Sequence, residues 1–407
     1  MRVPLRTIGG REFAVLDADP SWTVSNICLR MPDAPSSSAR VFHGVQELSG
    51  LRTLKELGVC DGSSLSVVFT DRLILTASRS AAHIWGADSG RLMHSLDMQG
   101  AALRSADFSP DGTCVLTASD DGAARLWSSS RGECIGVLEG HGAVVNAAAF
   151  SPDGSLVLTA SGDHTAKIWS RESRECKHIL RGHQAAVTCC DFSPRGGRAL
   201  TGSSDASTKL WRTDSGNCIR TLWGHGLFAV KSARFSPDGS LVITCVEGRT
   251  TAMWNANTGE CLRMLKGDRT GLLYQKFSPD GARIFTCMWD GCAELWSVEA
   301  HECLHVLEGR SVRMISAEFS RDCSLLVVTY ADGIAELWDA KSGEFLHSLH
   351  VAERHRVRVV SFSPDGALLL TASFEGTVKL WSVSSGRCLS VLQGHGERIT
   401  SAAFAQS

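Results

Sequence analysis

The sequence predicts an all-β fold of repeated four-stranded antiparallel units. One observation is the segment Gly140 to Arg181, where the runs AVVNAAAF, SLVLTAS, TAKIW and ECKHIL are separated by the turn sequences Ser-Pro-Asp-Gly and Gly-Asp-His. Another is that variants of this segment recur from residue 71 to the end of the chain. The repeats are marked by tryptophans spaced by 42 or 43 residues, namely Trp85, Trp127, Trp169, Trp211, Trp254, Trp296, Trp338 and Trp381.

The repeat unit resembles the WD-repeat family. Its period of about 42 residues, its Gly-His opening and the Trp that closes its third strand carry the resemblance. The resemblance implies that the units are the blades of a β-propeller, and eight tryptophans then imply an eight-bladed ring over residues 71–407.

The innermost strand of each blade is expected to end at a phenylalanine. These residues are Phe108, Phe150, Phe192, Phe235, Phe277, Phe319, Phe362 and Phe404. The last one follows the eighth Trp, so we expect residues 397–404 to supply the inner strand of blade 1 and to close the ring, which removes open sheet edges. The alternative assigns residues 64–69 to blade 1 and leaves the C-terminal strand surplus. The first assignment uses every strand once.

Residues 1–70 lack the period and predict a small α+β domain. They contain a hairpin-like segment over residues 1–19 with Gly9-Gly10 at its turn, a helical segment over 23–31, and three further pieces, ARVFHG, LRTLKELGV and SSLSVVF. Residues 39–69 resemble ubiquitin most specifically, through Phe-x-Gly, Arg-Thr-Leu and the last strand. The resemblance implies a ubiquitin-like (β-grasp) domain docked at the rim of the propeller, because only residues 70–72 link the two.

The ubiquitin resemblance also implies a recognition surface. The family's exposed apolar patch maps to Ile8, Val41, Ser66 and Val68, with a serine where the family has another polar residue. No di-glycine tail follows Phe69, so we expect a built-in recognition module and no conjugation. In the alternative interpretation, Val41 and Val68 pack against the propeller.

Composition narrows the class of protein. With 43% hydrophobic residues the chain can bury a large core, and a net charge of −2 gives no bulk field for nucleic acid or an anionic membrane. No apolar run is long enough to span a bilayer, so we expect a soluble protein of the cytoplasm or nucleus. Six cysteines lie seven residues after a repeat Trp, and we expect them to be small core residues without a metal or redox role: Cys134, Cys176, Cys218, Cys261, Cys303 and Cys388.

Two repeats contain a Ser/His/Asp set that could be mistaken for a hydrolytic triad. The set recurs with identical spacing, as His141, Ser161, Asp163 and Trp169 and then as His183, Ser203, Asp205 and Trp211. In the WD-repeat family it is a buried hydrogen-bond network that ties a loop to its blade. We therefore expect no enzyme, cofactor or metal site, and we expect blades 3 and 4, which keep the full set, to be the most rigid.

Binding residues are expected in loops that depart from the repeat. Large aromatic residues stand at such positions as Trp223, Phe228, Trp289 and Phe374. By family resemblance the channel mouth carries an arc biased towards positive charge, formed by Arg104, Lys231, Arg354, Arg356, Arg358 and Arg398. Aromatic and arginine side chains are enriched at protein–protein hot spots. The alternative is that Trp289 and Phe374 cap their own loops.

The sequence thus predicts a non-enzymatic scaffold or adaptor. Its propeller would bind a protein or peptide client, and its ubiquitin-like domain would link the client to ubiquitin-fold receptors of the ubiquitin-proteasome machinery. Two alternatives stay open: a scaffold subunit of a cytoskeletal or chromatin complex, and a nucleic-acid-binding propeller that uses the arginine arc, which the net charge disfavours.

Overall fold

The chain divides into two compact units in the computed structural model. One comprises residues 1–72 with 86–89 and the other residues 73–85 with 90–407, and each is described by itself. The structure describes residues 2–7, 12–22, 39–43, 46–48, 53–60, 63–69, 72–246, 250–266, 272–288, 292–300, 302–308, 312–351 and 357–405.

The first unit contains a mixed five-stranded sheet in the order β2-β1-β5-β3-β4. Its strands are β1 (Arg2–Thr7), β2 (Glu12–Asp17), β3 (Ala39–His43), β4 (Gln46–Leu48) and β5 (Leu65–Phe69). Strands β1 and β2 form the predicted antiparallel hairpin, whereas β1 and β5 run parallel at the centre of the sheet. Val3, Leu5 and Leu65 are fully buried. The helix expected over residues 23–31 lies outside the described residues.

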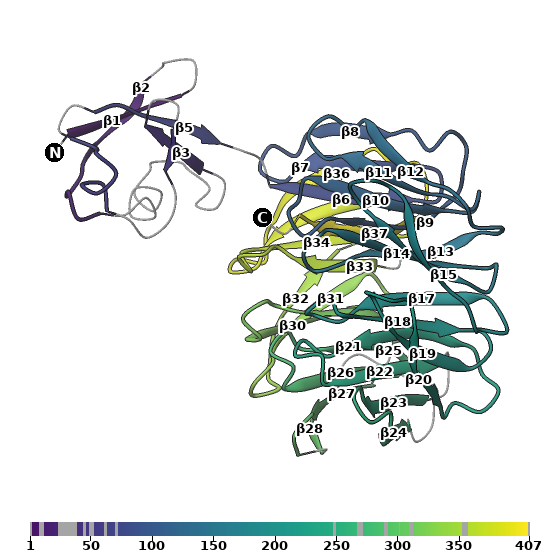
Figure 1. Cartoon of the computed structure of the whole chain (residues 1–407). Helices are drawn as coiled ribbons and strands as arrows, with labels where there is room; N and C mark the ends of the chain where they lie inside the picture. The colour runs from purple at the N-terminus through teal and green to yellow at the C-terminus, as the bar shows by residue number, and fades with distance from the viewer. Residues whose placement is uncertain are drawn as a thin grey trace. The chain divides into compact units, whose positions relative to one another are not determined.

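The second unit consists of eight four-stranded antiparallel sheets, which confirms the eight-bladed propeller (Figure 1). The innermost strands are β9 (Leu103–Phe108), β13 (Val145–Phe150), β17 (Val187–Phe192), β21 (Val230–Phe235), β25 (Leu272–Phe277), β29 (Met314–Phe319), β33 (Val357–Phe362) and β37 (Ile399–Phe404). The second strands are β6 (Leu73–Ser78), β10 (Cys114–Ser119), β14 (Leu156–Ser161), β18 (Arg198–Ser203), β22 (Leu241–Val246), β26 (Arg283–Met288), β30 (Leu325–Tyr330) and β34 (Leu368–Ser373).

The outer half of each blade follows the same order. The third strands are β7 (Ala82–Gly86), β11 (Ala124–Ser128), β15 (Ala166–Ser170), β19 (Ser207–Arg212), β23 (Thr250–Asn255), β27 (Cys292–Ser297), β31 (Ile334–Asp339) and β35 (Thr377–Ser382). The outermost strands are β8 (Leu92–Leu96), β12 (Cys134–Leu138), β16 (Cys176–Leu180), β20 (Cys218–Trp223), β24 (Cys261–Lys266), β28 (Cys303–Glu308), β32 (Phe345–His350) and β36 (Cys388–Gln393).

The C-terminal strand closes the ring, as predicted. Strand β37 pairs antiparallel with β6, with Phe404 opposite Ile74 and Ile399 opposite Ser78. It also contacts both β33 and β9, the inner strands of the two neighbouring blades. Figure 1 shows the yellow C-terminal strands beside the first blue strands of the propeller. The alternative in which residues 64–69 complete blade 1 is wrong, because β5 pairs with β1 and β3 in the other unit.

The hydrophobic core of the propeller lies between neighbouring blades. The repeat Trp side chains pack there against apolar residues of the adjacent blade. Trp169 of blade 3 packs in one buried cluster with Leu116 and Leu126 of blade 2. Second strands such as β10 are buried along their whole length, because a neighbouring blade covers each face. Full burial of a large apolar side chain contributes roughly 1.5–3 kcal/mol, so one contact layer per blade pair supplies much of the propeller's stability.

The six repeat cysteines are exposed, so the prediction that they are core residues is wrong. Each begins an outermost strand at a register shift, as between Leu126 and Trp127 opposite Cys134. This irregularity turns the cysteine to solvent, and its thiol donates to the carbonyl two residues later, 3.5 Å away for Cys176 and His178. Partial desolvation still raises the pKa of Cys176, which keeps this thiol protonated near neutral pH.

Candidate binding faces of the propeller

The propeller has two faces because successive turns of an antiparallel meander alternate between its ends. The Gly-His face carries the loops that lead from one blade to the next, such as residues 139–144, and the turns between second and third strands, such as residues 162–165. The Ser-Pro face carries the turns between first and second strands, such as residues 151–155, and those between third and fourth strands, such as residues 171–175.

On the Gly-His face of blade 3, a chain of hydrogen bonds links the Trp to the loop. Trp169 Nε1 donates to Thr159 Oγ1 over 2.9 Å, and Thr159 Oγ1 lies 2.8 Å from His141 Nε2. His141 Nδ1 lies 2.8 Å from Asp163 Oδ2, which also accepts from the Gly142 amide. All of these groups have a hydrogen-bond partner when His141 is neutral and carries its proton on Nδ1. Nδ1 then donates to Asp163, and Nε2 accepts from the threonine hydroxyl.

Blade 4 repeats the chain, with Trp211 to Thr201 at 2.8 Å, Thr201 to His183 at 2.9 Å and His183 to Asp205 at 2.9 Å. Burial lowers the pKa of His183 despite the neighbouring carboxylate, so the neutral form is favoured. The hydrogen bonds that Asp205 accepts outweigh its own desolvation and lower its pKa to about 2. Near neutral pH the set therefore favours a neutral histidine beside an ionised aspartate.

The serines lie beside this chain and not within it. Ser161 Oγ donates to the Ala143 carbonyl over 3.0 Å, and Ser203 Oγ donates to the Ala185 carbonyl over 3.1 Å. Neither contacts the histidine, whose Nε2 is occupied by the threonine. Ser161 and Ser203 therefore lack the base-to-nucleophile contact of a hydrolytic triad. In blade 4 a different serine lies beside the ring, with Ser207 Oγ 3.1 Å from His183 Nδ1, and it donates to Asp205 Oδ1 over 2.6 Å. Sequence reasoning missed the threonine, although it stands two residues before the serine in the repeated Leu-Thr-Ala-Ser.

Other blades keep part of the chain. In blade 5, Trp254 and His225 both bond Thr244, and Thr250 takes the second histidine nitrogen. In blade 1, His395 from the closing loop lies 2.7 Å from Thr76, and its ring lies against the ring of buried His83. Burial is the main reason that the pKa of His395 falls to about 4.

Two of the predicted binding aromatics lie close in sequence between blades 4 and 5, Trp223 at the end of β20 and Phe228 in the loop that follows it. Trp223 is 62% exposed and Phe228 is 40% exposed, and Leu227 between them is 96% exposed. Sequence reasoning missed Leu227, although Gly226-Leu227-Phe228 departs from the other Gly-His loops as clearly as Trp223 does. These three side chains are named the loop 223–228 patch.

Arg398 contacts Phe374 and lies near Arg358 where blade 8 adjoins blade 1. The Arg398 guanidinium lies 3.8 Å above the Phe374 ring, so a residue of the blade 1 loop covers a residue of a blade 8 turn. Burial and the adjacent Arg398 lower the pKa of Arg358, whose Nε is buried without a hydrogen-bond partner among the described residues. We name Phe374, Arg358 and Arg398 the closure arginine cluster.

The remaining predicted binding residues are dispersed. Arg104 and Lys231 are exposed on the inner strands β9 and β21, whereas Trp289, Arg354 and Arg356 lie outside the described residues.

One residue of the predicted ubiquitin-like patch, Val41, is fully buried on β3. Ser66 and Val68 are backbone neighbours of Phe42 and Arg40 across the β3–β5 pair. Ile8 lies outside the described residues.

Two family models match the propeller. Residues 90–128 match the WD domain, G-beta repeat. Residues 150–407, more than half of the chain, match the model of the IFT122 first beta-propeller. The chain belongs to this propeller family. The crystal structure of the computationally designed Ika8 protein is similar in fold, with a TM-score of 0.69 and 24% sequence identity over 78% of this chain and 95% of that chain. A search of curated proteins finds no match.

Membership of this family agrees with the geometry of both faces. The recurring His141–Asp163 and His183–Asp205 pairs hold loops in place, while Trp223, Leu227 and Phe228, which depart from the repeat, reach solvent. Among the described residues, no helix is long and apolar enough to cross a membrane, and no group of three or more His, Cys, Asp or Glu side chains could hold a metal ion.

Proposed function

We propose that the chain is a non-enzymatic protein-interaction scaffold whose Gly-His face binds a protein client. The observation that carries this proposal is the loop 223–228 patch, where Trp223, Leu227 and Phe228 expose large apolar side chains within six residues. Contiguous exposed apolar surface rimmed by polar groups marks interaction sites, and aromatic side chains supply most of the binding energy there. WD-repeat propellers are in general scaffolds, which supports the assignment.

The closure arginine cluster supports a second contact on the same face. Arg358 and Arg398 are adjacent, and no carboxylate pairs with either among the described residues. Such a cluster favours a client with acidic groups. It is also the feature that a nucleic-acid-binding propeller would use, and in that case binding would weaken steeply as salt rises.

We further propose that residues 1–70 form a ubiquitin-like domain that connects the client to a ubiquitin-fold receptor, with residues 71–407 as the propeller. The central parallel pair β1–β5, flanked by the hairpin β1–β2 and by β3–β4, supports this proposal. So does the division into compact units near residue 72. Docking of this domain at the propeller rim stays a prediction.

Affinity capture with the full chain tests the client site. The variant Trp223→Ala/Phe228→Ala should lose the proteins that the wild type retains, whereas Leu389→Ala, a matched control that is 59% exposed on an outermost strand, should keep them. Retention of every partner by the double variant would refute the site. In a separate capture, a variant lacking residues 1–70 should no longer retain ubiquitin receptors or proteasome subunits. If it retains all of them, the role proposed for the first domain is refuted.

A further inference from the structure

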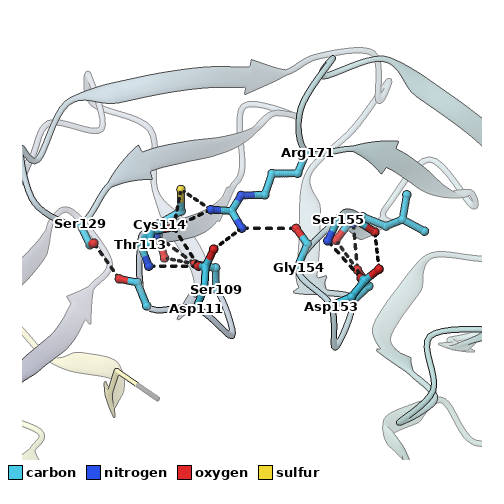
Figure 2. Close-up of polar contacts among 12 residues, drawn as sticks. Ser109, Asp111, Thr113, Cys114, Ser129, Asp153, Gly154, Ser155 and Arg171 are labelled. Atoms are coloured by element: carbon cyan, nitrogen blue, oxygen red, sulfur yellow. Dashed lines mark hydrogen bonds and ion pairs between the residues drawn. The ribbon is translucent and has the colours of Figure 1, made fainter. Parts of the chain in front are cut away.

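Six turns on the Ser-Pro face share one hydrogen-bonded cradle around an aspartate. In each Ser-Pro-Asp-Gly or related turn, the serine hydroxyl donates to the aspartate two residues later over 2.5–2.6 Å, and the amide four residues after the serine donates to it over 3.0–3.1 Å. Figure 2 shows two of these cradles, with Asp111 and Asp153. The serine and amide donors lower the pKa of Asp238 and Asp153, so the cradle favours an ionised carboxylate.

The turn of blade 4 keeps the cradle but lacks the carboxylate. Its sequence is Ser193-Pro194-Arg195-Gly196-Gly197, with arginine where the other six turns have aspartate. The backbone still forms the same turn, because Gly196 N donates to Ser193 O over 2.8 Å and Arg198 N donates to Ser193 Oγ over 3.0 Å. Ser193 Oγ and the Gly197 amide therefore occupy the two donor positions with no aspartate between them.

A pocket adjoins this turn, between blades 4 and 5. It has a volume of about 510 Å³ and is lined by Ser193, Gly197 and three arginines, Arg195, Arg198 and Arg212. The carboxylate in its lining is that of Asp238, which is already held in its own cradle by Ser236 and Ser240. Three positively charged side chains and one carboxylate therefore line the pocket, and this excess of positive charge favours an anionic ligand.

The junction between blades 2 and 3 shows what a guanidinium does on this face. Arg171 of blade 3 donates to Asp111 Oδ2 of blade 2 over 3.0 Å and to Thr113 Oγ1 over 2.7 Å, as Figure 2 shows. There the chain itself supplies both the arginine and the cradled carboxylate. At the junction between blades 4 and 5, the turn of blade 4 has Arg195 in place of the cradled aspartate.

We propose that the pocket between blades 4 and 5 on the Ser-Pro face binds an aspartate or glutamate side chain of an acidic segment in a partner protein. The partner's carboxylate occupies the position that aspartate has in the other turns, accepting from Ser193 Oγ and the Gly197 amide. Arg195 and Arg198 flank it, and Ile219 forms an apolar wall of the pocket. This site lies on the face opposite to the loop 223–228 patch and does not depend on it.

The cradle favours a carboxylate over a phosphate because of its donor set. Two donors converge on a single position that in six copies holds one carboxylate oxygen. Arg198 is partly committed, since it donates to Asn257 Oδ1 over 2.9 Å and to the Ala256 carbonyl over 3.3 Å. Arg212 is paired with exposed Asp214 at 3.3 Å. The arginines thus provide a positive wall but no unoccupied cluster that would surround a dianion.

The variant Arg195→Asp tests the site because its own carboxylate would occupy the cradle and exclude the carboxylate of the partner. Its new carboxylate restores the aspartate of the other turns, so its thermal midpoint should equal or exceed that of the wild type. A fluorescein-labelled hexa-aspartate peptide is titrated at low salt by fluorescence anisotropy into the full chain. We expect Arg195→Asp to weaken binding by about tenfold or more, because charge-assisted hydrogen bonds are lost. Arg131→Asp, the same charge change on the same face of blade 2, should leave binding nearly unchanged.

Three outcomes would overturn the proposal. One is equal binding of the peptide by the wild type and Arg195→Asp, and another is equal weakening by Arg131→Asp, which would indicate bulk charge alone. The third is displacement of the peptide by inorganic phosphate or by single-stranded DNA at lower concentration than by free hexa-aspartate, which would assign the pocket to a phosphate ligand. Arg198→Ala introduces no carboxylate into the cradle. It should therefore weaken binding of the peptide by a smaller factor than Arg195→Asp does.

Discussion

Blades 3 and 4 differ from blade 7 in how the repeat Trp is held. In blades 3 and 4 the indole N–H begins a chain of hydrogen bonds that ends at an aspartate in the loop. In blade 7, Trp338 is only 7% exposed, yet its Nε1 has no partner among the described residues, and Thr329 donates to the Ser316 carbonyl instead. The blade nevertheless forms all four strands.

Blade 7 has a different buried polar contact. Tyr330 donates from its hydroxyl to Glu336 over 2.8 Å, and both residues are almost completely buried. Trp338 also contacts Phe345 edge to face, with ring centroids 5.5 Å apart. The comparison teaches that packing of the Trp is enough to form a blade, whereas the polar chain attaches the Gly-His loop to it.

The largest difference in stability between blades 3 and 7 is expected when the threonine beside the repeat Trp is replaced. Thr159→Val leaves both Trp169 Nε1 and His141 Nε2 without their partner in a buried site. We expect the free energy of unfolding to fall by about 2–4 kcal/mol, because each unsatisfied buried group costs roughly 1–3 kcal/mol. Thr329→Val removes one bond to a carbonyl and should cost about 1 kcal/mol. Urea unfolding measures both, and equal losses would contradict the role assigned to the chain.

A smaller difference is expected when the indole nitrogen is removed. Trp169→Phe loses packing area and the hydrogen bond to Thr159, whereas Trp338→Phe loses area alone, because its Nε1 is already unpaired among the described residues. The first variant should therefore be less stable than the second by about 1 kcal/mol, the net worth of one hydrogen bond. Thermal melts of the two variants under identical conditions decide this. If Trp338→Phe is the more damaging, the indole of blade 7 has a role that its contacts do not explain.

The smallest expected effect is a pH dependence confined to the blades that contain the histidine. Burial lowers the pKa of His141 and His183 below the ordinary value of 6.5, so the folded state favours the neutral rings. Their contribution to stability is complete above pH 6.5 and is lost progressively as the pH falls towards the folded-state pKa.

Hydrogen exchange at three equivalent amides measures this pH dependence. Gly162 N donates to Val144 O, Ser204 N donates to Ala186 O, and Ala331 N donates to Arg313 O. After correction for the intrinsic rate, protection at the first two should fall between pH 6.5 and pH 5, while protection at Ala331 should change less. A parallel change at all three amides would show that the histidines do not govern the loops.

Much of the fold followed from periodic residues. Phe404 indicated the closing strand because it is the eighth member of a series that includes Phe150, and the series leaves blade 1 without an earlier inner strand. Trp223 and Phe228 were found as departures from the repeat. Leu227 was missed because a leucine in a loop is common, although its loop also departs from the repeat, and the structure shows this side chain to be 96% exposed. Cys134 was assigned to the core wrongly, since a periodic position indicates equivalence between blades and not burial.

The sequence by itself determined the number of blades, the order of their strands and the closure of the ring. These depend on alternation and spacing along the chain, which are local properties, and on an assignment that uses every strand once. The tertiary structure alone decided which hydroxyl bonds His141, where Arg398 lies, and that the turn of blade 4 faces a pocket lined by arginines. Those facts depend on strand register, on bulges and on contacts between neighbouring blades, which no local pattern in the chain specifies.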